Sequence, residues 1–209
     1  MEFCLGAIKN EEKWIRLYLS NIFKVPKKLP IIKTKFSGLV IYKRETFTDK
    51  RGYFRELFLK KNLNKKFVFD YYSLSKKNVL RGLHLQLKKP QGKLITVLSG
   101  KIFDVALDCR PKSKTFGQFY TVELSEKENT SLYIPEGFAH GFCSLANNTL
   151  LHYRCTNYRD KNSETGIYWK DNDLAINWPK KKFFVSSKDK KNILFKNFLE
   201  TKIFNKFKF

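Results

Sequence analysis

The sequence predicts an all-β fold for most of the chain, a sandwich or barrel built from short antiparallel strands. Short apolar runs separated by turn residues follow one another from about residue 36 to residue 156, and many short strands at close spacing are typical of such folds. The sequence contains no Gly-rich phosphate loop and no internal repeat, so a nucleotide-binding α/β unit is not expected. Its 209 residues suit one domain with a sizeable core.

Residues 1–33 are predicted to form a separate, helical N-terminal extension. Asn10 is a suitable N-cap, with two glutamates following in the first turn. Pro26 and Pro30 end the helix, because proline cannot continue it. The apolar side chains at helical spacing are Trp14, Ile15, Tyr18, Leu19 and Ile22. We favour a helix packed on the body or on a partner; a membrane-surface helix is the alternative.

Residues 34–190 are predicted to be the β domain. Within it only residues 56–65 look helical. Ser99 and Gly100 indicate a hairpin turn between two of the strands. The predicted strands are residues 38–42, 67–72, 79–87, 94–98, 101–107, 119–124, 131–134, 141–145 and 150–156.

Residues 191–209 form a basic C-terminal tail that is predicted to be helical. Leu194 and Phe198, and likewise Phe195 and Leu199, are four residues apart. We favour a helix docked on the body over a basic membrane-surface helix.

No apolar run approaches the roughly 20 residues that span a bilayer, and the N-terminus lacks the features of a signal peptide. We therefore expect a cytoplasmic protein without stable membrane insertion.

The net charge is +23, from 42 Lys plus Arg against 19 Asp plus Glu. Such an excess suits an anionic partner, whether nucleic acid, a membrane surface or a phosphorylated substrate. The lysines are spread over every segment, so we attribute most of the charge to composition and expect no nucleic-acid partner.

The cysteines form no CxxC pair and are expected to be reduced, mostly buried thiols; they are Cys4, Cys109, Cys143 and Cys155.

The stretch 79–93 carries the first candidate catalytic residues. It holds His84, one of three histidines, and ends at Lys93, after a turn at residues 90–92. A short turn between strands 79–87 and 94–98 predicts an antiparallel pair. His84 and Lys93 would then approach one cavity from neighbouring strands. A base beside a fixed positive charge suits removal of a proton next to a carbonyl and stabilisation of the enolate.

A second histidine, His140, ends the pattern Pro135-x-Gly137-x-x-His140, which resembles the second motif of the cupin superfamily. Metal-binding cupins have His-x-His and a glutamate in their first motif, where this chain has His84-Leu-Gln86. A catalytic metal usually has at least three protein ligands. We therefore expect no metal and no other cofactor, with Gln86 as a weak ligand the open alternative.

A set of sequence blocks follows one another through the β domain: residues 47–56, 78–84, 91–93, 103–110, 113–117, 134–142, 153–158, 169–171 and 176–179. In their order and spacing these blocks resemble the dTDP-4-dehydrorhamnose 3,5-epimerase family over residues 36–190. The resemblance implies a cupin-like double-sheet jelly-roll barrel with short terminal helices, and a cofactor-independent isomerase of a nucleotide-linked 4-keto-6-deoxy sugar. It also implies a role in dTDP-rhamnose and cell-surface polysaccharide or O-antigen biosynthesis, and a homodimer in which residues 36–56 complete the partner's site.

The resemblance also implies the roles of individual residues. His84 matches the general base, Asp189 the carboxylate that pairs with it, and Tyr153 the general acid on the opposite face of the sugar. Lys93 matches the cation that neutralises the developing enolate oxygen. Substrate-contacting positions match Phe47, Arg51, Glu56, Phe69, Tyr71, Arg81, Gln91, His140, Tyr158, Arg159, Glu164 and Lys188.

The chain departs from the family on the binding side. Phe69 and Tyr71 stand where the family has a Gln-x-Asn pair, and Arg159 stands where it stacks a tyrosine on thymine. Arg159 could stack on a base or pair with phosphate, or Tyr158 could replace it. We hypothesise that the preference for thymidine is relaxed or moved to another nucleotide.

Two other classes of function remain as alternatives. One is a single-carbon epimerase or 3,4-ketoisomerase acting on a UDP- or GDP-linked sugar. The other is a non-catalytic sugar- or nucleic-acid-binding cupin, which basic patches interleaved with stacking aromatics would favour.

Overall fold

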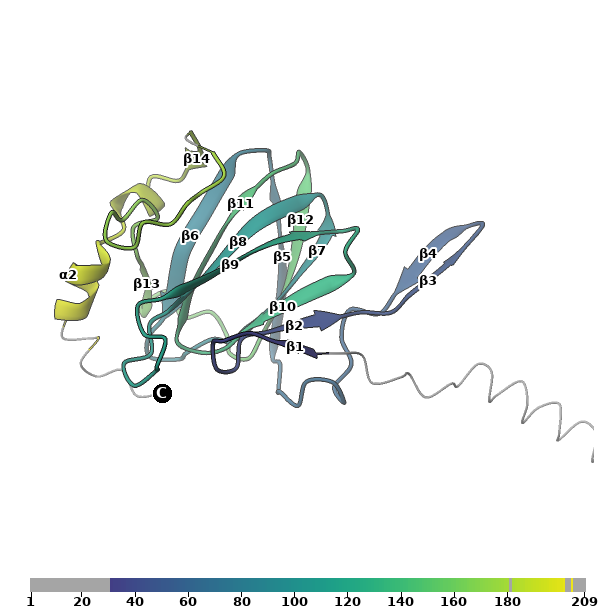
Figure 1. The fold of residues 1–209 in the computed structure, drawn as a ribbon, viewed down its shortest axis with the longest axis horizontal. Helices are drawn as coiled ribbons and strands as arrows, with labels where there is room; N and C mark the ends of the chain where they lie inside the picture. Colours follow the sequence, from purple (N-terminus) through teal and green to yellow (C-terminus); the bar gives the residue numbers. More distant parts are fainter. Residues whose placement is uncertain (1–30, 181, 202–203, 205–209) are drawn as a thin grey trace, which may run out of the picture.

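A computed structural model describes residues 31–180, 182–201 and 204 of the chain. Two six-stranded sheets face each other, and a separate two-stranded hairpin projects away from them (Figure 1). In chain order the elements are β1 (Ile31–Lys33), β2 (Val40–Lys43), β3 (Thr46–Asp49), β4 (Gly52–Arg55), β5 (Phe69–Ser75), β6 (Val79–Gln86), β7 (Lys93–Ser99), β8 (Lys101–Asp108), β9 (Phe119–Ser125), β10 (Thr130–Ile134), β11 (Phe138–Ser144), β12 (Thr149–Cys155), β13 (Glu164–Gly166), β14 (Phe184–Val185), the 3₁₀ turn η1 (Asp189–Lys191) and α2 (Phe195–Glu200).

The two large sheets form the double-sheet barrel that the resemblance implied. The first, called the β7 sheet, has the order β1-β2-β10-β7-β12-β5. The second, called the β6 sheet, has the order β13-β6-β11-β8-β9, and β14 pairs with β6. Alternate residues of each strand point between the sheets, and they bury a continuous apolar core there. Its members include Phe36, Leu39, Ile95, Val97, Ile102, Leu124, Leu132, Phe142 and Leu151.

The predicted pairing of strands 79–87 and 94–98 is wrong, although both segments are strands. β6 and β7 belong to opposite sheets. The connection between them is too long for a tight hairpin, and it is anchored elsewhere, since Gln91 donates a hydrogen bond to the Asn157 carbonyl at 2.6 Å. The chain therefore crosses from one sheet to the other, and His84 and Lys93 approach the interior from facing walls.

The turn at Ser99 and Gly100 makes a second crossing and is not the hairpin that we predicted. It joins β7 to β8, which lie in different sheets. Gly100 has φ +83°, and a Cβ there would lie 2.5 Å from Thr149 Oγ1. Its N–H donates to the Glu126 carboxylate at 3.0 Å. Glycine is thus required here for two reasons: other residues rarely adopt this positive φ, and a Cβ would clash with Thr149.

The helix predicted for residues 56–65 is absent; this segment is irregular. Phe58, Leu63 and Phe67 pack instead on the outer face of the β7 sheet, against an apolar cluster that includes Tyr133. The rings of Phe58 and Phe67 meet edge to face at 5.0 Å. Tertiary packing of these apolar side chains overrides local helix propensity.

Three short strands near the N-terminus were not predicted. β1 pairs with β2, so residues 31–33 belong to the β7 sheet and not to a helical extension. The rest of the predicted N-terminal helix lies outside the described residues. β3 and β4 form the projecting hairpin (Figure 1). Its aromatic side chains Phe47, Tyr53 and Phe54 are each more than half exposed.

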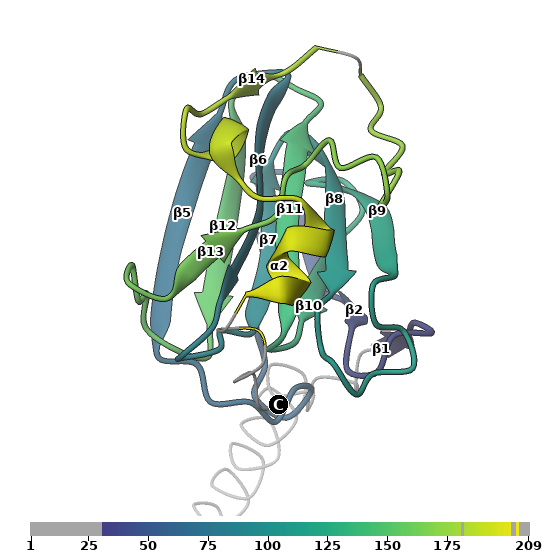
Figure 2. The same ribbon diagram turned by 90° about the vertical axis from the view of Figure 1, so that its left-hand side faces the viewer.

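At the C-terminal end, α2 lies against the outer face of the β6 sheet (Figure 2). Phe198 is 1% exposed and packs with Leu83, Val105 and Leu107. The apolar side of this helix is therefore covered by the barrel. The predicted helical tail over residues 191–209 is α-helical only at Phe195–Glu200 within the described residues, and residues 202–203 and 205–209 lie outside them. Within the part of the chain that the structure describes, no helix is long and apolar enough to cross a membrane. Cys109, Cys143 and Cys155 are free and buried, as predicted; Cys4 lies outside the described residues.

Candidate active site

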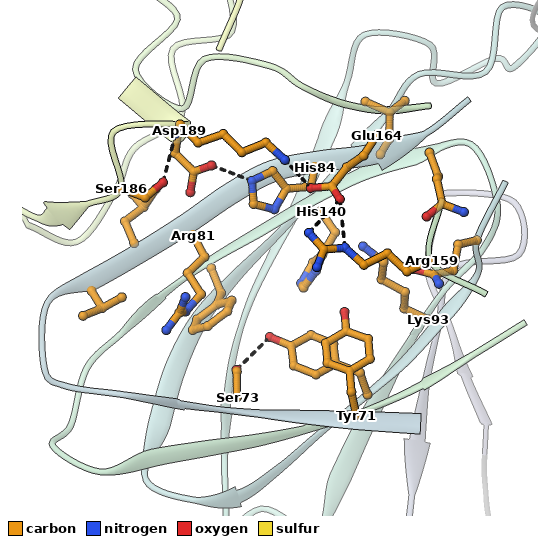
Figure 3. A pocket seen from close by; sticks show the side chains of 18 of the residues that line it. Tyr71, Ser73, Arg81, His84, Lys93, His140, Arg159, Glu164, Ser186 and Asp189 are labelled. Atoms are coloured by element: carbon orange, nitrogen blue, oxygen red, sulfur yellow. Dashed lines mark hydrogen bonds and ion pairs between the residues drawn. The ribbon is translucent and has the colours of Figure 1, made fainter. Parts of the chain in front are cut away.

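A cavity of about 480 Å³ opens between the two sheets (Figure 3). Its walls come from β5, β7 and β12 of one sheet and from β6 and β11 of the other, and the segment around η1 closes one side. Its volume falls in the range of small-molecule sites, roughly 300–1,000 Å³. Figure 3 shows His84 and Asp189 on one wall, with Ser73 and Tyr71 on the wall opposite.

His84 points into the cavity from β6 and is held by Asp189. Its Nε2 lies 2.6 Å from Asp189 Oδ1, and the Gly82 N–H donates to the other carboxylate oxygen at 3.3 Å. Burial raises the pKa of Asp189, but the hydrogen bond and charge of His84 outweigh it and hold this pKa below its usual range. With the Nε2 proton directed at a carboxylate, the second ring nitrogen of His84 remains available as a base.

His140 lies beside His84, because the two are partners in the β11–β6 register. Its Nε2 is 2.8 Å from Asp104 Oδ2, and both side chains are buried. Asp104 was missed by sequence reasoning. The sequence did contain a sign of its role. Asp104 falls between Ile102 and Ala106 on the inward face of a predicted strand, and a charged side chain is buried there only if it has a partner.

The opposite wall carries Tyr153, on β12. Its phenolic oxygen lies 3.3 Å from Ser73 Oγ on β5, and its ring stacks on that of Tyr71 with centroids 4.5 Å apart and planes 8° apart. Burial raises the pKa of Tyr153, although the Ser73 hydrogen bond lowers it slightly. The phenol therefore stays protonated at neutral pH, as a proton donor must. Ser73 was not predicted to belong to the site.

Lys93 is the first residue of β7 and lines the same cavity. It lies between Ile134 and Cys155 of the neighbouring strands in the sheet register. Burial lowers the pKa of its ammonium group, as expected where water cannot solvate the charge. Gln91 also lines the cavity, and its side-chain amide nitrogen donates a hydrogen bond to the Asn157 carbonyl.

Three charged residues form an ion-pair cluster in the cavity wall. Glu164 accepts from Arg159 at 3.1 Å and from Lys188 at 2.6 Å. Burial raises the pKa of Glu164, but these two cations hold it below its usual range. On the far side, Arg81 donates to Ser75 Oγ at 3.2 Å. Arg81, Arg159 and Lys188 give the cavity the positive charge that suits a phosphorylated ligand.

Four of the predicted substrate contacts are not in this cavity. Phe47 and Arg51 lie on the projecting hairpin, where Arg51 pairs with Asp49 at 2.6 Å. Glu56 lies at a different, smaller cavity on the outer side of the β7 sheet. Tyr158 is 64% exposed and lies just outside the cavity. The residues that the structure does bring together are His84, Asp189, Tyr153, Lys93, Phe69, Tyr71, Arg81, Gln91, His140, Arg159, Glu164 and Lys188.

Gln86 holds a loop in place. Its amide oxygen accepts from the Asp160 N–H, and its amide nitrogen donates to the carbonyls of Lys89 and Tyr158. Over residues 31–180, 182–201 and 204, no three His, Cys, Asp or Glu side chains are grouped so that they could hold a metal ion.

Comparison with known proteins shows which family the chain resembles. The sequence profile described as dTDP-4-dehydrorhamnose 3,5-epimerase matches residues 33–197. An epimerase of that name from Methanothermobacter thermautotrophicus is 45% identical over 153 residues, which are 71% of this chain and 83% of the relative. One from Shigella flexneri is 42% identical over 166 residues, 76% of this chain and 92% of the relative.

Solved structures extend the agreement to the fold. The epimerase from Elizabethkingia anophelis superposes with a TM-score of 0.77 at 38% identity, covering 82% of this chain and 98% of its own. That from Legionella pneumophila, solved with dTDP-4-keto-L-rhamnose, gives a TM-score of 0.76 at 42% identity, with 79% and 92% covered. The profile match spans most of the chain, and the fold and these identities agree with it, so the chain belongs to the dTDP-4-dehydrorhamnose 3,5-epimerase family.

Proposed function

We propose that this protein is a cofactor-independent epimerase that inverts C3 and C5 of dTDP-4-dehydro-6-deoxy-D-glucose to give dTDP-4-dehydro-L-rhamnose. One observation carries the proposal: His84 and Tyr153 face a single cavity from opposite sheets. Inversion needs a base on one face of the sugar and an acid on the other, and the barrel provides one on each wall. A ketoisomerase or a non-catalytic sugar-binding protein has no need of that arrangement.

The mechanism that we infer uses only side chains of the cavity. The 4-keto group acidifies the hydrogens at C3 and C5. His84, oriented by Asp189, removes one of them, and the Lys93 ammonium stabilises the enolate oxygen. Tyr153 then delivers a proton to the same carbon from the opposite face. Before the second inversion, His84 releases its proton to solvent and Tyr153 takes one up, and the same two transfers at the second carbon then complete the double inversion.

The proposal is tested by following the reaction in deuterated water by NMR. Incubation with dTDP-4-dehydro-6-deoxy-D-glucose is expected to place deuterium at both C3 and C5 and to yield the doubly inverted sugar. Deuterium at one carbon alone would identify a single-carbon epimerase. Migration of the keto group would identify a ketoisomerase, and binding without exchange a non-catalytic protein.

Activity is expected to survive EDTA. Among the described residues, no three His, Cys, Asp or Glu side chains are grouped so that they could hold a metal ion, and a catalytic metal usually has at least three protein ligands. Exchange at C3 and C5 is measured before and after dialysis against the chelator. Loss of exchange that a divalent ion restores would contradict the metal-free mechanism.

We further propose a homodimer in which the β3–β4 hairpin completes the partner's site. The hairpin extends away from its own barrel (Figure 1) and exposes Phe47, Tyr53 and Phe54 to solvent. Such a run of exposed aromatic side chains marks an interaction surface. Arg51 lies at the tip with its side chain 84% exposed. Among the described residues its hydrogen bonds go to Asp49, and we infer that a phosphate on the partner competes with this carboxylate for the guanidinium.

Mixing two inactive variants is expected to restore activity. Arg51→Ala and His84→Asn subunits, unfolded and refolded together, form mixed dimers in which one site has both residues intact. About one quarter of all sites would then be functional if the subunits pair at random. Each variant refolded alone is the control. A mixture no more active than the separate variants would contradict a shared site.

Nucleotide preference is the point on which this chain is expected to differ from its relatives. Arg159 lines the cavity, and Glu164 fixes its planar guanidinium. Phe69 lies beside Tyr158, with ring centroids 6.3 Å apart. These groups can stack on any base but offer little that distinguishes thymine, so we infer a relaxed preference.

Measuring kcat/KM for dTDP-, UDP- and GDP-linked 4-keto-6-deoxy sugars tests this inference. We expect values within about tenfold of one another, and Arg159→Ala should lower all of them together, because a stacking contact is worth about 1–3 kcal/mol per base. Arg159→Tyr is the matched variant that should restore a preference for dTDP. A strong dTDP preference that Arg159→Ala leaves unchanged would contradict the inference.

The place of action that we propose is the cytoplasm, in the supply of a deoxysugar for cell-surface polysaccharide such as O-antigen. The buried free thiols of Cys109, Cys143 and Cys155 suit a reducing compartment. Cell fractionation tests the location, and loss of rhamnose from surface polysaccharide in a deletion strain tests the pathway.

A further inference from the structure

Two of the inward-facing residues of β5 contact Tyr153 on the neighbouring strand β12. Alternate residues of this strand point into the cavity, namely Phe69, Tyr71 and Ser73. Ser73 contacts the hydroxyl of Tyr153, and Tyr71 stacks on the ring of the same tyrosine. Phe69 in turn packs on Tyr71 with ring centroids 5.4 Å apart.

Tyr71 and Tyr153 are direct cross-strand partners in the β5–β12 register. Side chains at such paired positions project side by side from the same face of the sheet. The result here is a parallel stack at 4.5 Å and 8°. The other ring that the structure places against Tyr153 is that of His140, at 6.3 Å and edge-on. Of these two rings, only that of Tyr71 lies parallel to the ring of Tyr153.

The hydroxyl of Tyr153 has only a weak constraint of its own. Its contact with Ser73 is 3.3 Å long, beyond the usual range of about 2.5–3.0 Å for hydroxyl pairs. A single long hydrogen bond leaves the ring free to turn about it. The ring plane must then be fixed by packing, and Tyr71 supplies that packing while Phe69 supports Tyr71 from behind.

We propose that Tyr71 is a positioning residue, which holds the ring of Tyr153 at the angle from which its proton reaches the sugar. This inference rests on the proposed function, because it assumes that Tyr153 is the acid. It assigns Tyr71 a task performed by its ring and not by its hydroxyl. A group that is misplaced by about 1 Å can lose on the order of 10²-fold in rate.

Two substitutions distinguish the contribution of the Tyr71 ring from that of the Tyr71 hydroxyl. Tyr71→Leu removes the stack, and Tyr71→Phe keeps it. Deuterium exchange at C3 and C5 and formation of inverted sugar are measured together, since His84 can still remove a proton and return it to the same face. Tyr71→Leu is expected to lower inversion about tenfold to a hundredfold and to raise the ratio of exchange to inversion by a similar factor. Tyr71→Phe should keep the wild-type ratio.

The matched control is Tyr72→Leu, the same substitution one residue along β5, where the side chain is 74% exposed on the other face of the strand. It should leave the ratio unchanged. Thermal unfolding reports whether each variant folds; if Tyr71→Leu does not, Tyr71→Met takes its place as a flexible side chain of similar reach.

Two results would overturn the proposal. One is a wild-type ratio of exchange to inversion in Tyr71→Leu. The other is a Tyr71→Phe variant as defective as Tyr71→Leu, which would show that the hydroxyl and not the ring is needed. Failure of the proposed function would look different, because the wild-type protein would then fail to invert both C3 and C5 before any substitution is made.

Discussion

His84→Asn is expected to lower the exchange of the C3 and C5 hydrogens with deuterated water by about 10²- to 10⁴-fold, the usual cost of losing a positioned base. Asparagine is a polar side chain of similar size, but it cannot accept a proton at neutral pH, and it is too short to replace the contact of His84 Nε2 with Asp189 at 2.6 Å. The loss corresponds to about 2.7–5.4 kcal/mol of transition-state stabilisation. NMR of the sugar in deuterated water measures it directly.

His152→Asn is the matched control for this variant. His152 also lies near a carboxylate, with Nε2 3.4 Å from Asp70, but it is on the outer face of the β7 sheet and does not line the cavity. The same substitution there should leave exchange unchanged. Wild-type deuterium uptake in a folded His84→Asn protein would remove His84 from the role of base.

Tyr153→Phe is expected to separate exchange from inversion. His84 on the opposite wall would still remove a proton and return it to the face from which it came. We expect deuterium in the sugar at close to the wild-type rate, while formation of the inverted sugar falls by about 10²- to 10⁴-fold. The phenylalanine ring keeps the stack on Tyr71, so the packing of the wall should be preserved.

Tyr120→Phe serves as the control for loss of a phenolic oxygen elsewhere in the barrel. Tyr120 packs edge to face on Phe36, away from the cavity, and its substitution should change neither rate. If Tyr153→Phe inverts the sugar at the normal rate, another group delivers the proton.

Local patterns in the sequence were enough to predict most of the barrel strands. Alternation along β6 places Leu83 outward and His84 inward, and the structure has them so. Alternation does not say which strands are neighbours. The connection after β6 looked like a turn because Pro90 and Gly92 are turn residues, but its residues are bound to the loop after β12, and such long-range contacts leave no local pattern.

In the candidate site, too, contacts between residues far apart in the sequence could not be predicted from local patterns. The pairing of His84 with Asp189 joins residues 105 positions apart, and only resemblance to a family could suggest it. Ser73 and Asp104 were missed because a serine or an aspartate within a strand is usually an exposed residue or a structural partner. Their importance comes from the residues that they contact, Tyr153 and His140.

The position of Asp189 in the chain has a consequence for when the enzyme becomes active during its own synthesis. Every strand of the two facing sheets precedes it, so the barrel can close on the ribosome before this carboxylate has been made. Domains generally fold as they emerge, and a nascent barrel would expose a cavity in which His84 still lacks its partner. If Asp189 orients His84 as we propose, reactivity toward keto sugars begins only once the segment that carries Asp189 has been released and has docked beside β6.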